Sequence, residues 1–195
     1  MFNFLSRSAD ASTLAAGMVG VKMGDRIVQI GCAHGGRLGA IAAGVGLSGR
    51  AVAIVPDEAS AARVNKGAAQ AGVLVEIETA PPTRLPADAG AFDVAIVDDT
   101  GGLFATMRAE DRVATVREVL RILRPGGRVM VIAATARGGA RALLTRALAV
   151  LMTDLPARSG PRFDPGPSLQ ADGFRSVRTL AERDGLLFVE AIKPR

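Results

Sequence analysis

The sequence predicts an α/β fold in which a mostly parallel sheet is covered by helices on both faces. Short apolar runs, each long enough for one buried strand, alternate with helical segments along most of the chain. A strand that is buried on both faces of a parallel sheet is apolar along its whole length. The last two apolar runs are instead joined by Asp184-Gly185, which is a typical hairpin turn. We therefore expect parallel strands first and a β-hairpin at the end of the chain.

The expected elements follow from this alternation. The expected strands are 26–30, 51–55, 73–77, 92–97 and 128–133, with hairpin strands within 173–180 and 186–192. Helices are expected at 36–45, 58–71, 110–123 and 137–152, after an N-terminal helical segment in 1–24. The helix at 110–123 has acids in its first turn and arginines near its end, as the helix dipole favours, and Pro125 prevents its continuation. The stretch 156–167, within 153–172, shows no periodicity, and we expect it to form a loop over a binding site.

Composition narrows the class of protein. A chain of 195 residues with 49% hydrophobic and 22% charged residues suits one domain with one core, so we assign 1–195 to a single domain. No apolar stretch could span a bilayer and no cleavable leader is visible, so we expect no membrane segment and a cytoplasmic location. The net charge of +5 comes from scattered arginines, and Trp and Tyr are absent, which makes a nucleic-acid partner unlikely. A small-molecule partner is expected, and nothing in the sequence indicates the oligomeric state.

A glycine-bearing turn follows the first expected strand and opens an alanine-rich helix. It reads Ile30-Gly31-Cys32-Ala33-His34-Gly35-Gly36. Residues without a side chain allow backbone N–H groups and a helix N-terminus to approach a ligand closely. We expect Gly31 and Gly35 to make backbone contacts with a ligand.

Four motifs, in their order along the chain, together resemble class I S-adenosylmethionine-dependent methyltransferases, in particular the compact group that methylates small molecules. They are Val28-Gln29-Ile30-Gly31-Cys32-Ala33-His34-Gly35, the strand from Phe92 to Asp98, Leu120-Arg121-Ile122-Leu123-Arg124-Pro125-Gly126-Gly127-Arg128, and the ending from Asp172-Gly173-Phe174 to Lys193-Pro194. The resemblance covers nearly the whole chain. It implies a Rossmann-like, mostly parallel seven-stranded sheet with an antiparallel C-terminal hairpin strand, and S-adenosylmethionine bound across the carboxyl ends of the first strands.

The resemblance also implies cofactor contacts, at positions where this chain departs from the family. The family's acids are replaced by Gln29 before the turn, by Pro56 at the end of the second strand, and by Pro81 in the following loop. Ala33 stands where the family has its middle glycine. Asp57 could replace the missing ribose ligand by a shift of one residue, or it could cap the next helix. The implied cofactor-binding residues are Gln29, Gly31, Ala33, Gly35, Asp57 and Asp98.

Two residues are candidates for catalysis. His34 lies at the mouth of the turn beside a helix N-terminus, which favours a neutral imidazole that could act as a base, unless it is a loop histidine without a role. Asp98 and Asp99 end the fourth strand and point to opposite faces, so only one can face the cleft, and either could close the next turn through an Asx hydrogen bond. Cys32 is expected to be a buried apolar residue. With one His and one Cys, and Ala133-Ala134 where a metal-dependent methyltransferase would carry ligands, no metal is expected.

Two functions remain open at this point. The first is methyl transfer from S-adenosylmethionine to an unidentified small molecule. The alternative is a non-catalytic methyltransferase-fold protein whose cofactor binding is weakened or lost, and which acts as a binding or interaction module. The replacements at Gln29, Pro56 and Pro81 motivate the alternative.

Overall fold

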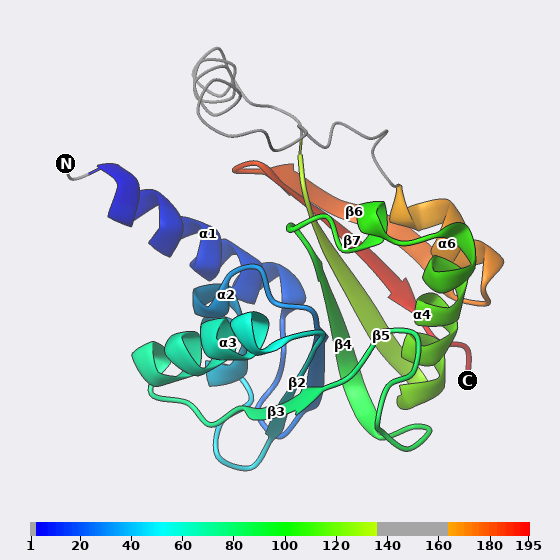
Figure 1. Cartoon of the computed structure of the whole chain (residues 1–195), viewed down its shortest axis with the longest axis horizontal. Coiled ribbons are helices and arrows are strands. Elements are labelled where there is room, and N and C mark those ends of the chain that lie inside the picture. Colours follow the sequence, from blue (N-terminus) through cyan, green and yellow to red (C-terminus); the bar gives the residue numbers. More distant parts are fainter. Residues whose placement is uncertain (1–2, 136–163) are drawn as a thin grey trace.

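Seven strands form one sheet in the order β3-β2-β1-β4-β5-β7-β6 (Figure 1). The computed structural model describes residues 3–135 and 164–195. Its strands are β1 Arg26–Ile30, β2 Arg50–Val55, β3 Glu76–Thr79, β4 Phe92–Asp99, β5 Leu123–Ala134, β6 Arg175–Arg183 and β7 Leu186–Ile192. The strands from β1 to β5 pair in parallel, and β7 lies antiparallel between β5 and β6. The predicted fold class is confirmed.

The terminal hairpin forms at the predicted turn. Asp184 and Gly185 both adopt positive φ angles, 53° and 79°, as a two-residue hairpin turn of this kind requires. The turn lets β7 pair with β6 on one side and with β5 on the other.

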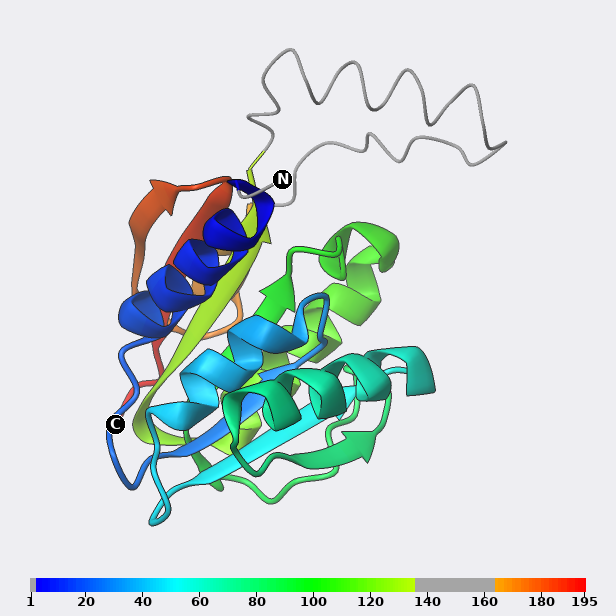
Figure 2. The same ribbon diagram turned by 90° about the vertical axis from the view of Figure 1, so that its left-hand side faces the viewer.

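Helices cover the two faces of the sheet unequally. They are α1 Asn3–Val19, α2 Gly35–Ala43, α3 Glu58–Ala71, the short 3₁₀ helix η1 Phe104–Thr106, α4 Ala109–Ile122 and α6 Pro165–Ala171. Figures 1 and 2 show α1, α2 and α3 on one face, and α4 and α6 on the other. The connection from β3 to β4 contains no helix, so a loop in residues 80–91 lies beside α4.

The core divides into clusters on the two faces because side chains alternate along each strand. Val28 and Ile30 of β1 pack on the α4 side, whereas Ile27 packs on the side of α1 and α2. In β4 the same alternation places Val97 toward α4 and Ile96 toward the other helices. This alternation also decides where Asp98 and Asp99 point at the end of β4.

Three expected elements differ from the structure. The strand expected at 73–77 is β3, Glu76–Thr79, because Val73 and Val75 lie before the strand and pack against the core from the loop. Residues 124–127, which separate the expected helix 110–123 from the expected strand 128–133, lie within β5, where Leu123 pairs with Phe92 and Arg128 with Val94, so the extra residues form a bulge. Part of the loop expected at 153–172 is a helix, α6, which Asp164 caps by accepting a hydrogen bond from the Gly166 N–H.

The helix predicted at 137–152 and the loop portion 153–163 lie outside the described residues. Within the described residues, no helix has the length and apolar character needed to cross a bilayer.

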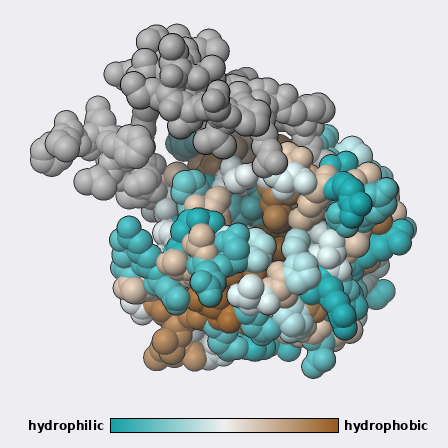
Figure 3. Space-filling model, viewed as in Figure 1, coloured by the Kyte–Doolittle hydropathy of each residue, from teal (hydrophilic) through white to brown (hydrophobic). Residues whose placement is uncertain are grey.

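Hydrophilic residues cover most of the face seen in Figure 3, with a hydrophobic area at its lower left. Met23, Leu47 and Leu74 are the most exposed large apolar residues, and each precedes one of the strands β1, β2 and β3.

Candidate cofactor site

The candidate site lies where the strand order reverses, between β1 and β4. The next strands along the chain lie on opposite sides of this pair: β2 beside β1, and β5 beside β4. Ligands of open α/β sheets bind at the carboxyl ends of strands at such a point, because the connections diverge there. The turn after β1 and the turn after β4 meet at this position: the Gly31 Cα lies close enough that a Cβ there would be 3.4 Å from the Asp98 carbonyl oxygen.

The two glycines that the sequence singled out have different surroundings. Gly31 has a φ angle of +74°, which a residue with a side chain adopts only under strain, and its N–H donates to the Ile54 carbonyl at 2.9 Å. Gly35 faces α3 instead: a Cβ there would lie 1.8 Å from the Arg63 carbonyl oxygen. The conformation of the turn therefore requires Gly31, and the packing of α2 on α3 requires Gly35.

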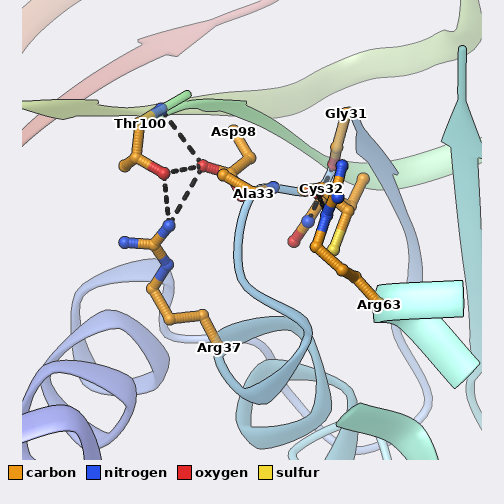
Figure 4. A network of polar contacts seen from close by, with 8 residues as sticks. Gly31, Cys32, Ala33, Arg37, Arg63, Asp98 and Thr100 are labelled. Carbon is orange, nitrogen blue, oxygen red and sulfur yellow. Dashed lines mark hydrogen bonds and ion pairs between the residues drawn. The ribbon is translucent and has the colours of Figure 1, made fainter. Parts of the chain in front are cut away.

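Asp98 is the centre of a buried polar network (Figure 4). Its Oδ2 accepts from the Ala33 N–H at 2.8 Å, and its Oδ1 accepts from the Arg37 guanidinium at 3.2 Å. Oδ1 also accepts from the Thr100 N–H and hydroxyl, which is the Asx-type bond expected at this turn. An internal carboxylate thus already binds a backbone N–H of the glycine turn.

Arg37 joins α2 to the end of β4. Its side chain is 8% exposed, and one terminal nitrogen, Nη2, donates to both Asp98 and the Thr100 hydroxyl. Its Nε and Nη1 have no bonding partner among residues 3–135 and 164–195. A nearly buried guanidinium with unused donors is therefore available at the switch point.

Arg37 was not predicted as a site residue, although the sequence of α2 contains a signal for it. It is the one charged residue in α2, which is otherwise built from glycine, alanine, leucine and isoleucine. A single arginine in such a helix has to leave the apolar surface or find a partner inside the protein. Because the sequence does not show which side chains meet, the partnership with Asp98 could not be inferred.

Gln29 and Cys32 make hydrogen bonds that hold the glycine turn in place. Gln29 is buried, and its amide nitrogen donates to the Gly31 carbonyl at 2.9 Å. Cys32 is buried as expected, and burial, followed by the negative charge of Asp98, raises the pKa of its thiol to about 11. Its carbonyl accepts from Arg63 Nε of α3 at 2.8 Å. Neither residue has a carboxylate that could bind a ligand.

At the end of β2, Asp57 takes the helix-capping role that was one of its two predicted roles. Its Oδ1 accepts from the Ser60 N–H at 2.7 Å, so it caps α3, and this bond lowers the pKa of the carboxyl below its usual range. The cap uses Oδ1 of an exposed residue, and a cofactor contact at Asp57 stays a prediction. Pro56 and Pro81, at the other two positions, are exposed and have no side-chain donor or acceptor.

His34 and Asp99 have perturbed protonation. Loss of hydration, followed by the positive charge of Arg37, lowers the pKa of His34 below 6.5, so the imidazole is neutral near pH 7. This is the state expected from sequence, with a different leading cause. Burial raises the pKa of Asp99 to about 6, although the Phe104 N–H donates to its Oδ1 at 2.7 Å. Asp99 faces η1 and α4, opposite to Asp98, as the alternation along β4 requires.

A metal site is not indicated by this arrangement. Within the part of the chain that the structure describes, no three His, Cys, Asp or Glu side chains lie close enough together to hold an ion.

Comparison with known proteins connects this site to a family. A family model described as a methyltransferase domain matches residues 27–127, which span β1, the glycine turn and the first part of β5. The chain belongs to the class I S-adenosylmethionine-dependent methyltransferase family. No curated protein sequence matches it.

Solved structures of this methyltransferase fold are similar over almost the whole chain. A SAM-dependent methyltransferase from Aquifex aeolicus has a TM-score of 0.68 and 16% identity, over 93% of this chain and 89% of that one. A SAM-dependent O-methyltransferase from Thermotoga maritima has a TM-score of 0.63 and 17% identity, over 95% of this chain and 65% of that one. The [4+2]-cyclase SpnF has a TM-score of 0.62 and 18% identity, over 95% of this chain and 80% of that one. At these identities the similarity extends to the fold alone.

Proposed function

We propose that this methyltransferase-family protein transfers a methyl group from S-adenosylmethionine to a small molecule. The observation that carries the proposal is the polar pair Arg37–Asp98 beside the glycine turn, at the point where the strand order reverses. An amino-acid group carries one carboxylate and one ammonium. The pair offers a partner of opposite charge to each of them.

The residues present fit the amino-acid end of the cofactor better than its nucleoside end. Arg37 has unused N–H donors for a carboxylate, and Oδ2 of Asp98 accepts only one hydrogen bond, from the Ala33 N–H, so one acceptor position is left there for an ammonium. At the nucleoside end, Pro56 and Pro81 replace side chains that would accept hydrogen bonds from ribose and adenine. We therefore expect Arg37 to supply a large share of the affinity.

The bound cofactor would supply an electrophilic methyl group. Residues around the turn would then align the acceptor and exclude water, which is the main requirement of a direct displacement. His34 suits the role of proton acceptor when the acceptor atom carries a proton, because its lowered pKa keeps the imidazole neutral. Asp98 suits it less, because four donors already bind its two oxygens.

The test compares two ligands that differ only at the amino-acid end. S-adenosylhomocysteine has that end, and 5′-methylthioadenosine lacks it. Titration calorimetry of the wild-type protein should give saturable binding of S-adenosylhomocysteine in the micromolar range. Arg37→Gln should weaken this binding by about 10- to 100-fold, the value of a charge-assisted hydrogen bond of about 1.5–3 kcal/mol, and leave 5′-methylthioadenosine unchanged.

Comparing the two ligands also distinguishes the loss of the Arg37 contact from a distortion of the whole site. If Arg37→Gln disturbed the whole site, both affinities would fall together. Arg183→Gln is the control, since Arg183 is an exposed residue at the far edge of the sheet. A flat titration with millimolar S-adenosylhomocysteine would refute cofactor binding.

A second function is favoured by a specific observation. Ala33, Gln29 and Asp57 all satisfy their hydrogen bonds within the protein, which suits a fold that no longer depends on a cofactor. In that case the protein would be a binding or interaction module. A flat titration, together with an unfolding temperature that S-adenosylhomocysteine does not change, would support this function.

A further inference from the structure

An arginine of α3, the helix that follows β2, contacts the glycine turn. Arg63 lies on α3, next to the glycine turn. Its Nε donates to the Cys32 carbonyl at 2.8 Å, and its Nη2 donates to the Ser60 hydroxyl at 2.7 Å. These two bonds, from different elements, hold the guanidinium in place while the side chain remains exposed at the surface.

Arg63 has no carboxylate partner among the described residues. Arg50 on the neighbouring strand forms an ion pair with Glu76, and Arg37 forms one with Asp98, whereas the contacts of Arg63 are to a neutral carbonyl and a hydroxyl. Its Nη1 makes no bond within residues 3–135 and 164–195. The charge is therefore free to bind an anion.

The positive charge of Arg63 affects the pKa values of residues in the glycine turn. Arg63 contributes to lowering the pKa of His34, and it offsets part of the increase in the pKa of Cys32. Arg63 also contributes to lowering the pKa of Asp57, but the Asp57 carboxylate caps α3 and forms no ion pair with the guanidinium. The Arg63 guanidinium thus lies without an ion pair beside the glycine turn, although Asp57 and Glu58 begin the same helix.

Nucleotide-binding α/β folds indicate what an arginine near this strand can bind. An acid near the end of the second strand accepts hydrogen bonds from the ribose hydroxyls, and an arginine in that region instead accommodates a phosphate on the ribose. A planar guanidinium that is already fixed loses little freedom when it binds phosphate through two hydrogen bonds.

We propose that the surface beside the glycine turn binds a nucleotide whose ribose carries a phosphate on its 2′ or 3′ oxygen, with Arg63 as the phosphate ligand. The proposal rests on the proposed function in one respect, the placement of the ribose at the end of β2. Such a nucleotide would occupy the position of the adenosyl group, so it would compete with an S-adenosyl ligand. Binding of the S-adenosyl ligand would then be regulated by phosphorylated nucleotides.

The test measures binding by calorimetry at one fixed salt concentration, because an exposed arginine is screened by ions. The probes are adenosine, adenosine 2′-, 3′- and 5′-monophosphate, and inorganic phosphate. Wild-type protein should bind the 2′- or the 3′-phosphate at least about tenfold tighter than both adenosine and the 5′-phosphate. The better nucleotide should displace S-adenosylhomocysteine. Arg63→Gln should remove the preference, Arg63→Lys should keep part of it, and the control Arg183→Gln should keep all of it.

Each other outcome would overturn the proposal. Equal affinities for adenosine and its phosphates, or no binding of any nucleotide, would remove the phosphate site. Equal binding of the 5′-phosphate would indicate unspecific attraction, and equal binding of inorganic phosphate would show that no nucleotide is recognised. A preference that persists in Arg63→Gln would exclude this residue. The proposed methyl transfer is judged separately, since it stands or falls with the S-adenosylhomocysteine titration in the absence of nucleotide.

Discussion

A single methyl group added at Gly67 should force α2 and α3 apart. The two helices cross with backbone against backbone: a Cβ on Gly67 would lie 2.1 Å from the carbonyl carbon and oxygen of Gly35. A Cβ on Gly39 would likewise lie 2.6 Å from the Gly67 carbonyl oxygen. These obstacles are backbone atoms, so no side-chain rotation can relieve the contact.

The size of the effect follows from this geometry. Ordinary van der Waals contact begins near 3.4 Å, so Gly67→Ala requires the helices to separate by about 1.3 Å. Overpacking of this kind costs about 1–3 kcal/mol or more, whereas replacing a helical glycine by alanine gains up to about 1 kcal/mol. We expect a net loss of about 2 kcal/mol in the free energy of unfolding, or about 4–8 °C in Tm for a chain of this length.

Urea unfolding followed by circular dichroism measures this loss. Gly17→Ala is the matched control, because Gly17 lies in helix α1 and a Cβ there has no atom within 4 Å. That variant should gain up to about 1 kcal/mol from helix propensity alone. A Gly67→Ala variant as stable as the wild type would refute the close backbone contact, and with it the explanation given for Gly35.

Three further predictions concern the site. Asp98→Asn leaves the buried Arg37 without its ion pair and should cost about 3–5 kcal/mol in urea unfolding, whereas Arg108→Gln, in an exposed pair, should cost less than about 0.5 kcal/mol. The Asp99 pKa of about 6 lies above its ordinary 3.8, so between these values the folded state keeps a proton that the unfolded state has lost. The free energy of unfolding should therefore fall by up to about 3 kcal/mol as pH rises from about 4 to about 6, and then level off. Asp99→Asn should flatten this profile, and an unchanged profile would assign the titration to another group. The raised pKa of about 11 predicts that iodoacetamide alkylates Cys32 at pH 8 at least about 100-fold more slowly in the folded than in the urea-unfolded protein. Mass spectrometry measures both rates, and equal rates would contradict the burial of Cys32.

Periodicity predicted most of the fold because it reports burial. The apolar runs of β1, β2 and β4 are buried along almost their whole length, so their strands were located to within one or two residues. The same signal placed β3 too early, because Val73 and Val75 are apolar and pack against the core from the loop before the strand. Short helices such as α6 contain too few residues to show a period.

The site was predicted less completely, since its contacts join residues that are far apart in the sequence. The glycine turn and Asp98 were identified as site residues, but the 2.8 Å bond between the Ala33 N–H and Asp98 joins positions 65 residues apart. The capping role of Asp57 is local, over three residues, and was foreseen as one of two alternatives. Local hydrogen bonds are therefore readable from sequence, whereas the pairing of Arg37 with Asp98 needs the three-dimensional fold.

The hydrogen bonds of the site determine which ligand groups can add affinity. A ligand anion that replaced Asp98 at the Ala33 N–H would exchange one hydrogen bond for another and release a carboxylate, so the net gain is small. An anion that binds the unused donors of Arg37 or Arg63 breaks no internal bond and gains a charge-assisted one. Affinity at this site should therefore follow the negative charge of the ligand, and the neutral sulfide S-adenosylhomocysteine should bind more tightly than the positively charged sulfonium cofactor. A calorimetric comparison in which the sulfonium form bound equally well would show that these arginines do not govern recognition.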